Sequence, residues 1–164
     1  MTKFEKISEE QWVKDNKQWV KDTKLEGAFE KVILPRRGTA HSAGYDFYAP
    51  YEVVLRPNET AVIKTGVKCA LEDGDVLMLY PRSSMGFKYG LQLVNTVGII
   101  DADYYNNPSN EGHIMIGIKN TGIRTVVIDR GERFAQGVIV GYKITDDDNP
   151  MSEVRKGGIG STDK

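Results

Sequence analysis

The sequence predicts an all-β fold, a sandwich or a jelly roll, preceded by a short helix. From Phe29 onward, short runs rich in Val, Ile, Leu and Tyr alternate with clusters of turn residues, which is typical of strands joined by tight turns. Many short strands at such spacing favour two-layered or closed β architectures. The expected strands are residues 29–34, 52–55, 61–65, 76–80, 91–96, 113–118, 125–128 and 137–144.

The first 26 residues predict a helical extension of this domain. Ser8 and Gln11 have the spacing of a capping box, so a helix is expected to start there. The heptapeptide QWVKDNK at 11–17 is nearly repeated by QWVKDTK at 18–24, and Gly27 is expected to end the segment. The repeat predicts one apolar face made by Trp12, Val13, Trp19 and Val20. Two heptads are too few for a coiled coil, so we favour an amphipathic helix packed on its own domain over a partner-binding helix.

Composition limits the function. The chain has 164 residues, 40% of them hydrophobic, which suits one domain with a packed core. Its net charge of -1 disfavours a nucleic-acid-binding surface but leaves room for a small anion held by a few Arg and Lys side chains. The single cysteine, Cys69, excludes an intrachain disulfide and is expected to be a buried apolar residue. Without a signal-like start or an apolar stretch of about 20 residues, we expect no membrane contact and a cytoplasmic protein.

Residues 81–86, Pro-Arg-Ser-Ser-Met-Gly, follow the predicted strand 76–80. Arg82, Ser83, Ser84 and Gly86 offer a guanidinium group, two hydroxyls and open backbone N–H groups. Those donors suit a polyphosphate. The alternative is an ordinary turn, which a segment of this kind forms more often.

An apolar strand over residues 98–100 runs directly into Asp101 and Asp103, which at strand spacing would share one face. A carboxylate at the mouth of a pocket can deprotonate a water molecule. The alternative is an Asx-type turn that closes a hairpin.

Further along, residues 157–162 form a Gly-rich stretch that could wrap a phosphate, although its spacing is not that of a Walker A loop. Three consecutive aspartates at 146–148 are interpreted as a solvated loop rather than a metal site. His41 and His113 lie far apart and no Cys/His cluster exists, which disfavours zinc chemistry.

The order of five segments carries a stronger signal than any one of them. Residues 43–46 (AGYD), 81–84 (PRSS), 95–104, 131–136 (GERFAQ) and 157–162 resemble the five ordered motifs of the trimeric dUTPase family. The resemblance covers residues 29–164. It implies a jelly-roll-like β barrel over residues 27–154, a flexible C-terminal lid over 155–164, a homotrimer with shared active sites, and hydrolysis of dUTP to dUMP and pyrophosphate.

The resemblance also implies roles for individual residues. Asp46 would hold the water shell of a Mg²⁺ ion that rides on the triphosphate, and Asp101 would activate the attacking water. Tyr104 would lie against the deoxyribose and exclude a 2′-hydroxyl. Phosphate contacts would come from Arg82, Ser83, Ser84, Gly86, Gln136, Arg155, Gly158, Ser161 and Thr162. Base contacts would come from Asn95, Ile99, Ile100, Asp101, Met115 and Ile159, with those from 95 to 101 inside a β hairpin.

Three departures from the family pattern stand out. Residues 105–111 are inserted where the family usually has a very short turn, Phe134 replaces an aliphatic residue, and Ile159 stands where the family has Phe, so lid closure over the base is expected to be weaker. Two other functions stay open at this point. One is a dCTP deaminase of the same fold, and the other is a nucleotide-gated regulatory protein that binds a partner through the N-terminal helix or the insert.

Overall fold

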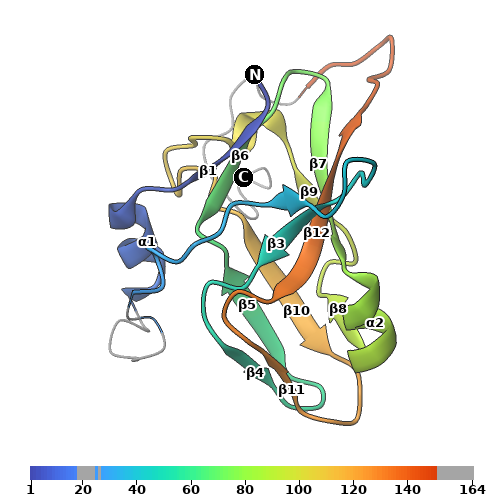
Figure 1. Ribbon diagram of the computed structural model, residues 1–164. Coiled ribbons are helices and arrows are strands. Elements are labelled where there is room, and N and C mark those ends of the chain that lie inside the picture. The colour runs from blue at the N-terminus through green and yellow to red at the C-terminus, as the bar shows by residue number, and fades with distance from the viewer. Residues whose placement is uncertain (18–24, 26, 151–164) are drawn as a thin grey trace.

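A computed structural model describes residues 1–17, 25 and 27–150 of the chain, and it confirms the all-β prediction (Figure 1). The strands are β1 (Lys3–Lys6), β2 (Arg36–Arg37), β3 (Tyr45–Tyr48), β4 (Val53–Leu55), β5 (Thr60–Lys64), β6 (Val67–Ala70), β7 (Asp75–Pro81), β8 (Leu91–Leu93), β9 (Gly98–Ile100), β10 (Met115–Asn120), β11 (Val126–Ile128) and β12 (Arg133–Gly141). The helices are α1 (Glu9–Asp15), α2 (Ser83–Tyr89) and the 3-10 turn η3 (Ala102–Tyr104).

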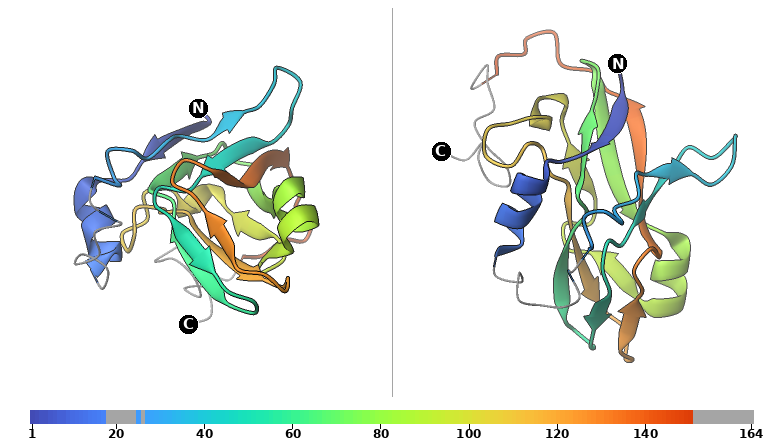
Figure 2. Two further views of the ribbon diagram at one scale, coloured as in Figure 1. Left: turned by 60° about the horizontal axis from the view of Figure 1, so that its bottom comes forward. Right: turned by 60° about the vertical axis from the view of Figure 1, so that its left-hand side comes forward.

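The largest sheet has five strands in the order β2-β3-β12-β7-β9. A three-stranded sheet, β5-β10-β8, and two pairs, β11-β4 and β1-β6, complete the β structure. Alternate residues point inward, so Leu77 and Leu79 of β7 and Ile116 and Ile118 of β10 are all buried in one core. Helices α1 and α2 lie on opposite sides of the strands in all three views (Figures 1 and 2).

Strand β12 organises the large sheet because residues 133–137 pair with β3 and residues 135–141 pair with β7. A bulge between Arg133 and Ala135 lets it meet β3 at its start. In the middle, a Cβ atom on Gly137 would lie 2.7 Å from Leu77 Cδ1 and 3.0 Å from Phe47 Cε2. Glycine is therefore required at this position of β12, where core side chains of β3 and β7 pack against its backbone.

The predicted strand at 29–34 is wrong, because this segment forms turns rather than a ladder. Its apolar residues are still used: Val32 is buried, as is Ala28 just before the segment, and the Val32 N–H bonds back to the Phe29 carbonyl as in a helical turn. Strand β6 was not predicted, although it contains Cys69. That thiol is buried and burial raises its pKa to about 12, which confirms its reading as an apolar core residue.

Helix α1 starts where the capping box predicts, because the Ser8 hydroxyl accepts a hydrogen bond from Gln11 N at 3.1 Å. Trp12 is 5% exposed and packs beside the rings of Phe29 and Tyr51, so the helix packs on its own domain as we favoured. Val13 is 46% exposed, so the prediction that it shares a face with Trp12 is wrong. Neighbouring helical residues point about 100° apart. Trp19 and Val20 lie outside the described residues.

The N-terminal segment also contains a strand, β1, which the prediction of a purely helical extension missed. Strand β1 pairs antiparallel with β6. After it, the Ser8 backbone N–H donates to the Glu111 carboxylate at 2.9 Å, and the Ser8 hydroxyl donates to the same group. Burial acts to raise the pKa of Glu111, but these bonds and the nearby Lys68 ammonium outweigh it and lower that pKa.

We predict that Glu111→Gln lowers the free energy of unfolding at pH 7 by roughly 1 kcal/mol, because a neutral amide accepts more weakly from Ser8. A carboxyl with a lowered folded pKa stabilises above its unfolded value, and this contribution is lost as the pH falls through the folded pKa. The difference between variant and wild type should therefore shrink at about pH 3. Urea unfolding at both pH values measures this, with Glu72→Gln, which loses only an exposed ion pair to the N-terminal ammonium, as control. An equal deficit at both pH values would contradict the argument.

Candidate functional site

Three of the motif segments meet around one buried carboxylate. Asp46, on β3, is 7% exposed. Its Oδ1 lies 2.8 Å from Nε of Arg82, which follows β7, and its Oδ2 lies 3.2 Å from Nη1 of Arg133, at the start of β12. The two guanidinium groups remain partly exposed. The cluster therefore carries a net positive charge toward solvent, which suits a phosphate-bearing ligand.

Gln136 lies next to this cluster on the same sheet, where Asp46 and Tyr80 are its cross-strand partners. Its Nε2 donates to the Pro81 carbonyl at 3.2 Å. A Cβ on Gly44 would come within 2.7 Å of Gln136 Oε1, so a larger residue there would force the Gln136 side chain to shift. The first, second and fourth motifs are thus brought together by the pairing of β3, β12 and β7.

Ser83 and Ser84 open helix α2, an element that was not predicted. The reading of this segment as an ordinary turn is therefore wrong. Met85 is buried and anchors the helix to the core, whereas Ser83 is exposed and Ser84 half-buried. Gly86 lies within the helix. This places both hydroxyls directly after Arg82.

The third motif occupies a different place. Ile99 and Ile100 belong to β9, which pairs with β7. Asp101 is the residue before the 3-10 turn η3 and Asp103 lies inside it, so the prediction that they share a strand face is wrong. Asn95 lies in the exposed turn between β8 and β9. The expected hairpin forms only in part, because β8 pairs antiparallel with β10 whereas β9 pairs with β7 in another sheet.

Tyr104 ends η3 and is 8% exposed. Its hydroxyl donates to the His113 carbonyl at 3.0 Å and accepts from Asn110 Nδ2 at 2.8 Å. Met115, half-buried, begins β10 opposite Lys64. The Tyr104 hydroxyl is thus engaged within the chain, and only the small exposed part of the residue is open to contact a ligand.

The two halves of the candidate site lie at opposite ends of β7. Ile100, next to Asp101, pairs with Leu77, whereas Arg82 follows the far end of the same strand at Pro81. Five residues of strand span about 16 Å. Figure 1 shows α2 at one end of β7 and the segment after β9 toward the other. One chain therefore does not bring Asp101 to the arginine cluster.

Arg155, Gly158, Ile159, Ser161 and Thr162 lie outside the described residues. Within the described ranges, no group of three or more His, Cys, Asp or Glu side chains is arranged to hold a metal ion. None of the helices described is long and apolar enough to cross a membrane.

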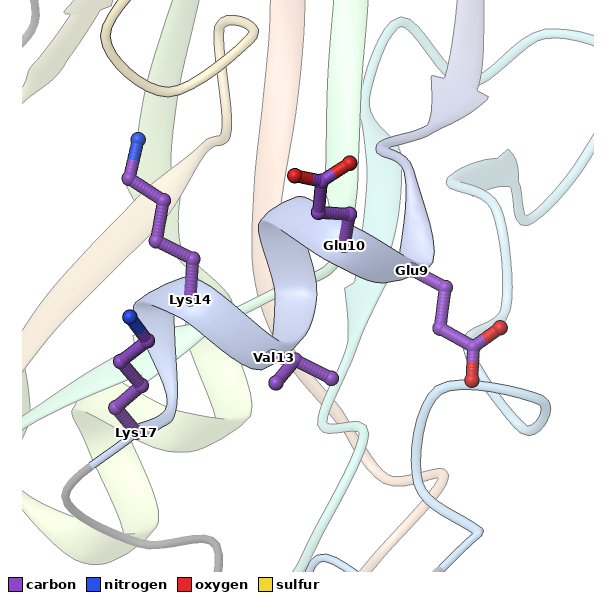
Figure 3. A pocket seen from close by; sticks show the side chains of 5 residues that line it. All are labelled: Glu9, Glu10, Val13, Lys14 and Lys17. Carbon is purple, nitrogen blue, oxygen red and sulfur yellow. The ribbon is translucent and has the colours of Figure 1, made fainter.

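A pocket on the outer side of α1 is lined by Glu9, Glu10, Val13, Lys14 and Lys17, none of them a predicted site residue (Figure 3).

Comparison with known proteins agrees with the order of the motifs. The family model dUTPase matches residues 30–163. The deoxyuridine 5'-triphosphate nucleotidohydrolase of Lactococcus lactis is 48% identical over 132 residues, which cover 80% of this chain and 88% of that protein. This chain therefore belongs to the dUTPase family.

Solved structures show the same fold. A dUTPase crystal structure from Streptococcus mutans has a TM-score of 0.69 and 40% identity, covering 87% of this chain and 98% of that one. The dUTPase of phage phi11 of Staphylococcus aureus, described as carrying a species-specific insert, has a TM-score of 0.67 and 25% identity, covering 93% and 97%. These matches confirm the family fold that the resemblance implied.

Sequence reasoning assigned no role to Arg133, although it lies in the quoted fourth motif. Its position at the first residue of β12, opposite Tyr48 on β3, brings it to Asp46 only through the sheet register. A carboxylate between two arginines is a tertiary feature, and no local pattern in the sequence indicates it.

We predict that Asp46→Asn lowers the free energy of unfolding by about 1–3 kcal/mol, because two guanidinium groups lose their shared counter-charge. Chemical denaturation at neutral pH measures the loss. Asp73→Asn, an exposed aspartate in the turn before β7, is the matched control. A loss no larger than that of the control would show that the Asp46 ion pairs contribute nothing to stability.

Proposed function

We propose that this chain hydrolyses dUTP to dUMP and pyrophosphate, which would keep uracil out of DNA and supply dUMP for dTMP synthesis. The observation that carries the proposal is the convergence of three motif segments on Asp46, with Arg82, Arg133 and Gln136 around it. An enzyme of the nucleotide pool would act in the cytoplasm.

In the proposed complex, Arg82, Ser83, Ser84, Gly86 and Gln136 bind the phosphate chain. Phosphoryl hydrolysis needs neutralised charge and an aligned nucleophile. The Arg82 guanidinium is held by Asp46 at Nε and by the Arg133 carbonyl at Nη1, so the group is kept in a fixed orientation. Such pre-organisation favours the transition state, because the donors need not reorder as charge develops.

The residues around Asp46 also fit a Mg²⁺ ion carried by the substrate. Both Asp46 oxygens already accept from arginine side chains, so this carboxylate suits contact through metal-bound water rather than direct ligation. Bound Mg²⁺ would neutralise phosphate charge. A solved structure of a variant of the phi11 phage dUTPase is described as showing the coordination of a structural Mg(II) ion.

The base and sugar would bind at the other half of the site. Asp101 is the general base that deprotonates the attacking water at the α-phosphorus. Tyr104 packs against the deoxyribose and excludes a 2′-hydroxyl. Uracil contacts come from the side chain of Asn95, the backbone of residues 99–101 and the backbone of Met115. A site built to pair with uracil leaves buried polar groups unmatched by cytosine, which can reject it by about 10⁴-fold.

Residues 155–164 would close over the bound nucleotide. In this proposal Arg155, Gly158, Ser161 and Thr162 contact the γ-phosphate, and Ile159 lies at the base. An aliphatic Ile159 cannot stack as flatly as an aromatic ring, so base contact is expected to be weaker than in relatives that carry Phe.

A homotrimer would complete each site. Asp101 and Arg82 lie at opposite ends of β7, so a substrate that needs both must contact two chains. Closed symmetric assembly brings unlike surfaces of neighbouring copies together and repeats the same composite site at each interface. The dCTP deaminase alternative is not favoured, since the family match is to dUTPases. No contact among the described residues favours a regulatory function.

Pyrophosphate release from dUTP, dCTP, dTTP and UTP, with and without Mg²⁺, tests the activity itself. We expect rapid release from dUTP only, and faster release with Mg²⁺. Absence of release from dUTP would overturn the proposed function.

We predict that Asp101→Asn keeps the fold and nucleotide binding but lowers kcat by roughly 10²–10⁴, the usual effect of losing a general base. The matched control is Asp103→Asn, an exposed aspartate in the same 3-10 turn, which should retain most of the activity. Steady-state kinetics on dUTP gives both values. An Asp101→Asn enzyme with near-normal kcat would remove Asp101 from the mechanism.

A further inference from the structure

The inserted residues 105–111 and the N-terminal segment form one hydrogen-bonded unit. Glu111 accepts from the backbone and hydroxyl of Ser8, the residue that caps α1. Lys14, on α1, donates to the Ser109 carbonyl at 3.0 Å. Each contact joins residues about a hundred positions apart, so the insert and α1 support each other.

His113, two residues after the insert, attaches it to the core through hydrogen bonds at both ring nitrogens. Its ring is fully buried, with Nδ1 2.6 Å from the Asp15 carboxylate. Its Nε2 accepts the Gly66 backbone N–H at 2.9 Å, so the ring proton sits on Nδ1 and is donated to Asp15. Bonds at both nitrogens fix the ring, and with it the backbone carbonyl of His113.

The same insert encloses Tyr104. Asn110 Nδ2 donates to the Tyr104 hydroxyl, which in turn donates to the His113 carbonyl. Asn107, itself buried, donates from Nδ2 to the Tyr104 carbonyl at 2.8 Å. A Cβ on Gly112 would lie 2.5 Å from that carbonyl, so the loop closes tightly over the residue. Tyr104 is thus held at its backbone and at the tip of its ring.

We propose that Asn110 is a positioning residue for sugar selection: with the His113 carbonyl, it fixes the tip of the Tyr104 ring, and the N-terminal segment supports both. This inference rests on the proposed function, in which Tyr104 excludes the 2′-hydroxyl. The Tyr104 ring can exclude a 2′-hydroxyl by steric contact only if the ring stays in place. A side chain free to shift by 1 Å would make room for the extra oxygen. The longer turn of this chain supplies that support from within one subunit.

Asn110→Asp is a nearly isosteric test. Asn110 Oδ1 accepts from Asn107 Nδ2 and from Gly112 N, and an aspartate keeps both acceptor roles. The donor to the Tyr104 hydroxyl is lost, and this hydroxyl, with one proton, can then donate either to the carboxylate or to the His113 carbonyl, so one of the two bonds at the ring tip is lost. We expect the ratio of kcat/KM for dUTP to that for UTP to fall about 10-fold, the scale of one hydrogen bond.

Asn106→Asp is the matched control, because it makes the same change in the same loop. Asn106 Oδ1 already accepts from Lys68 Nζ at 2.7 Å and does not face Tyr104. Its dUTP/UTP ratio should equal that of the wild type. Tyr104→Phe removes the hydroxyl and both of its bonds while keeping the ring, so it should lower the ratio as Asn110→Asp does, even if the latter folds poorly.

The outcomes separate the two proposals. A wild-type chain that releases no pyrophosphate from dUTP overturns the proposed function and this inference with it. A wild-type chain that hydrolyses dUTP, with an unchanged dUTP/UTP ratio in folded Asn110→Asp or Tyr104→Phe, overturns only the positioning role. In that case the contacts to Tyr104 simply hold the loop, and the variants would lose thermal stability without losing selectivity.

Discussion

The antiparallel pairing of β7 with β9 sets the distance between the two halves of the candidate site. It fixes Asp101 near the start of β7, while Arg82 leaves the other end of the same strand. A sheet cannot fold over such a short distance, so no side-chain rotation brings the proposed base to the proposed phosphate ligands. The separation within one chain is thus the structural reason to expect sites shared between copies.

In the half of the candidate site expected to bind phosphate, ion pairs and strand register together position the side chains. Pairing of β3 and β7 with β12 places Asp46 between two arginines, so the anion-binding groups are aligned before any ligand arrives. On the other half, hydrogen bonds hold the Tyr104 side chain. There Asn110 of the insert and the carbonyl of His113, which follows the insert, bind the Tyr104 hydroxyl. The N-terminal segment that supports the insert is therefore part of the domain, and its apolar side, centred on Trp12, is already covered.

The sequence predicted the features that depend on local chemistry. The start of α1 followed from the Ser8 capping box, most strand positions followed from apolar runs between turns, and the candidate site residues came from motif order. Helix α2 was missed because its N-cap residue, Arg82, makes no side-chain capping bond and because Gly86 lies in its interior. The strand predicted at 29–34 failed because apolar residues can pack without a ladder partner. Contacts such as Arg133 with Asp46 arise only from the register of distant strands.

Subunit mixing tests the shared site most directly. Arg82→Ala and Asp101→Asn chains, each expected to be inactive alone, would be unfolded together in equal amounts and refolded. If each site takes Arg82 from one chain and Asp101 from a neighbour, random assembly restores intact sites at about a quarter of the wild-type number. Sedimentation of each variant alone controls for assembly. Recovery of about a quarter of the wild-type dUTP turnover is the predicted result, and turnover no higher than the sum of the separate variants would contradict the shared site.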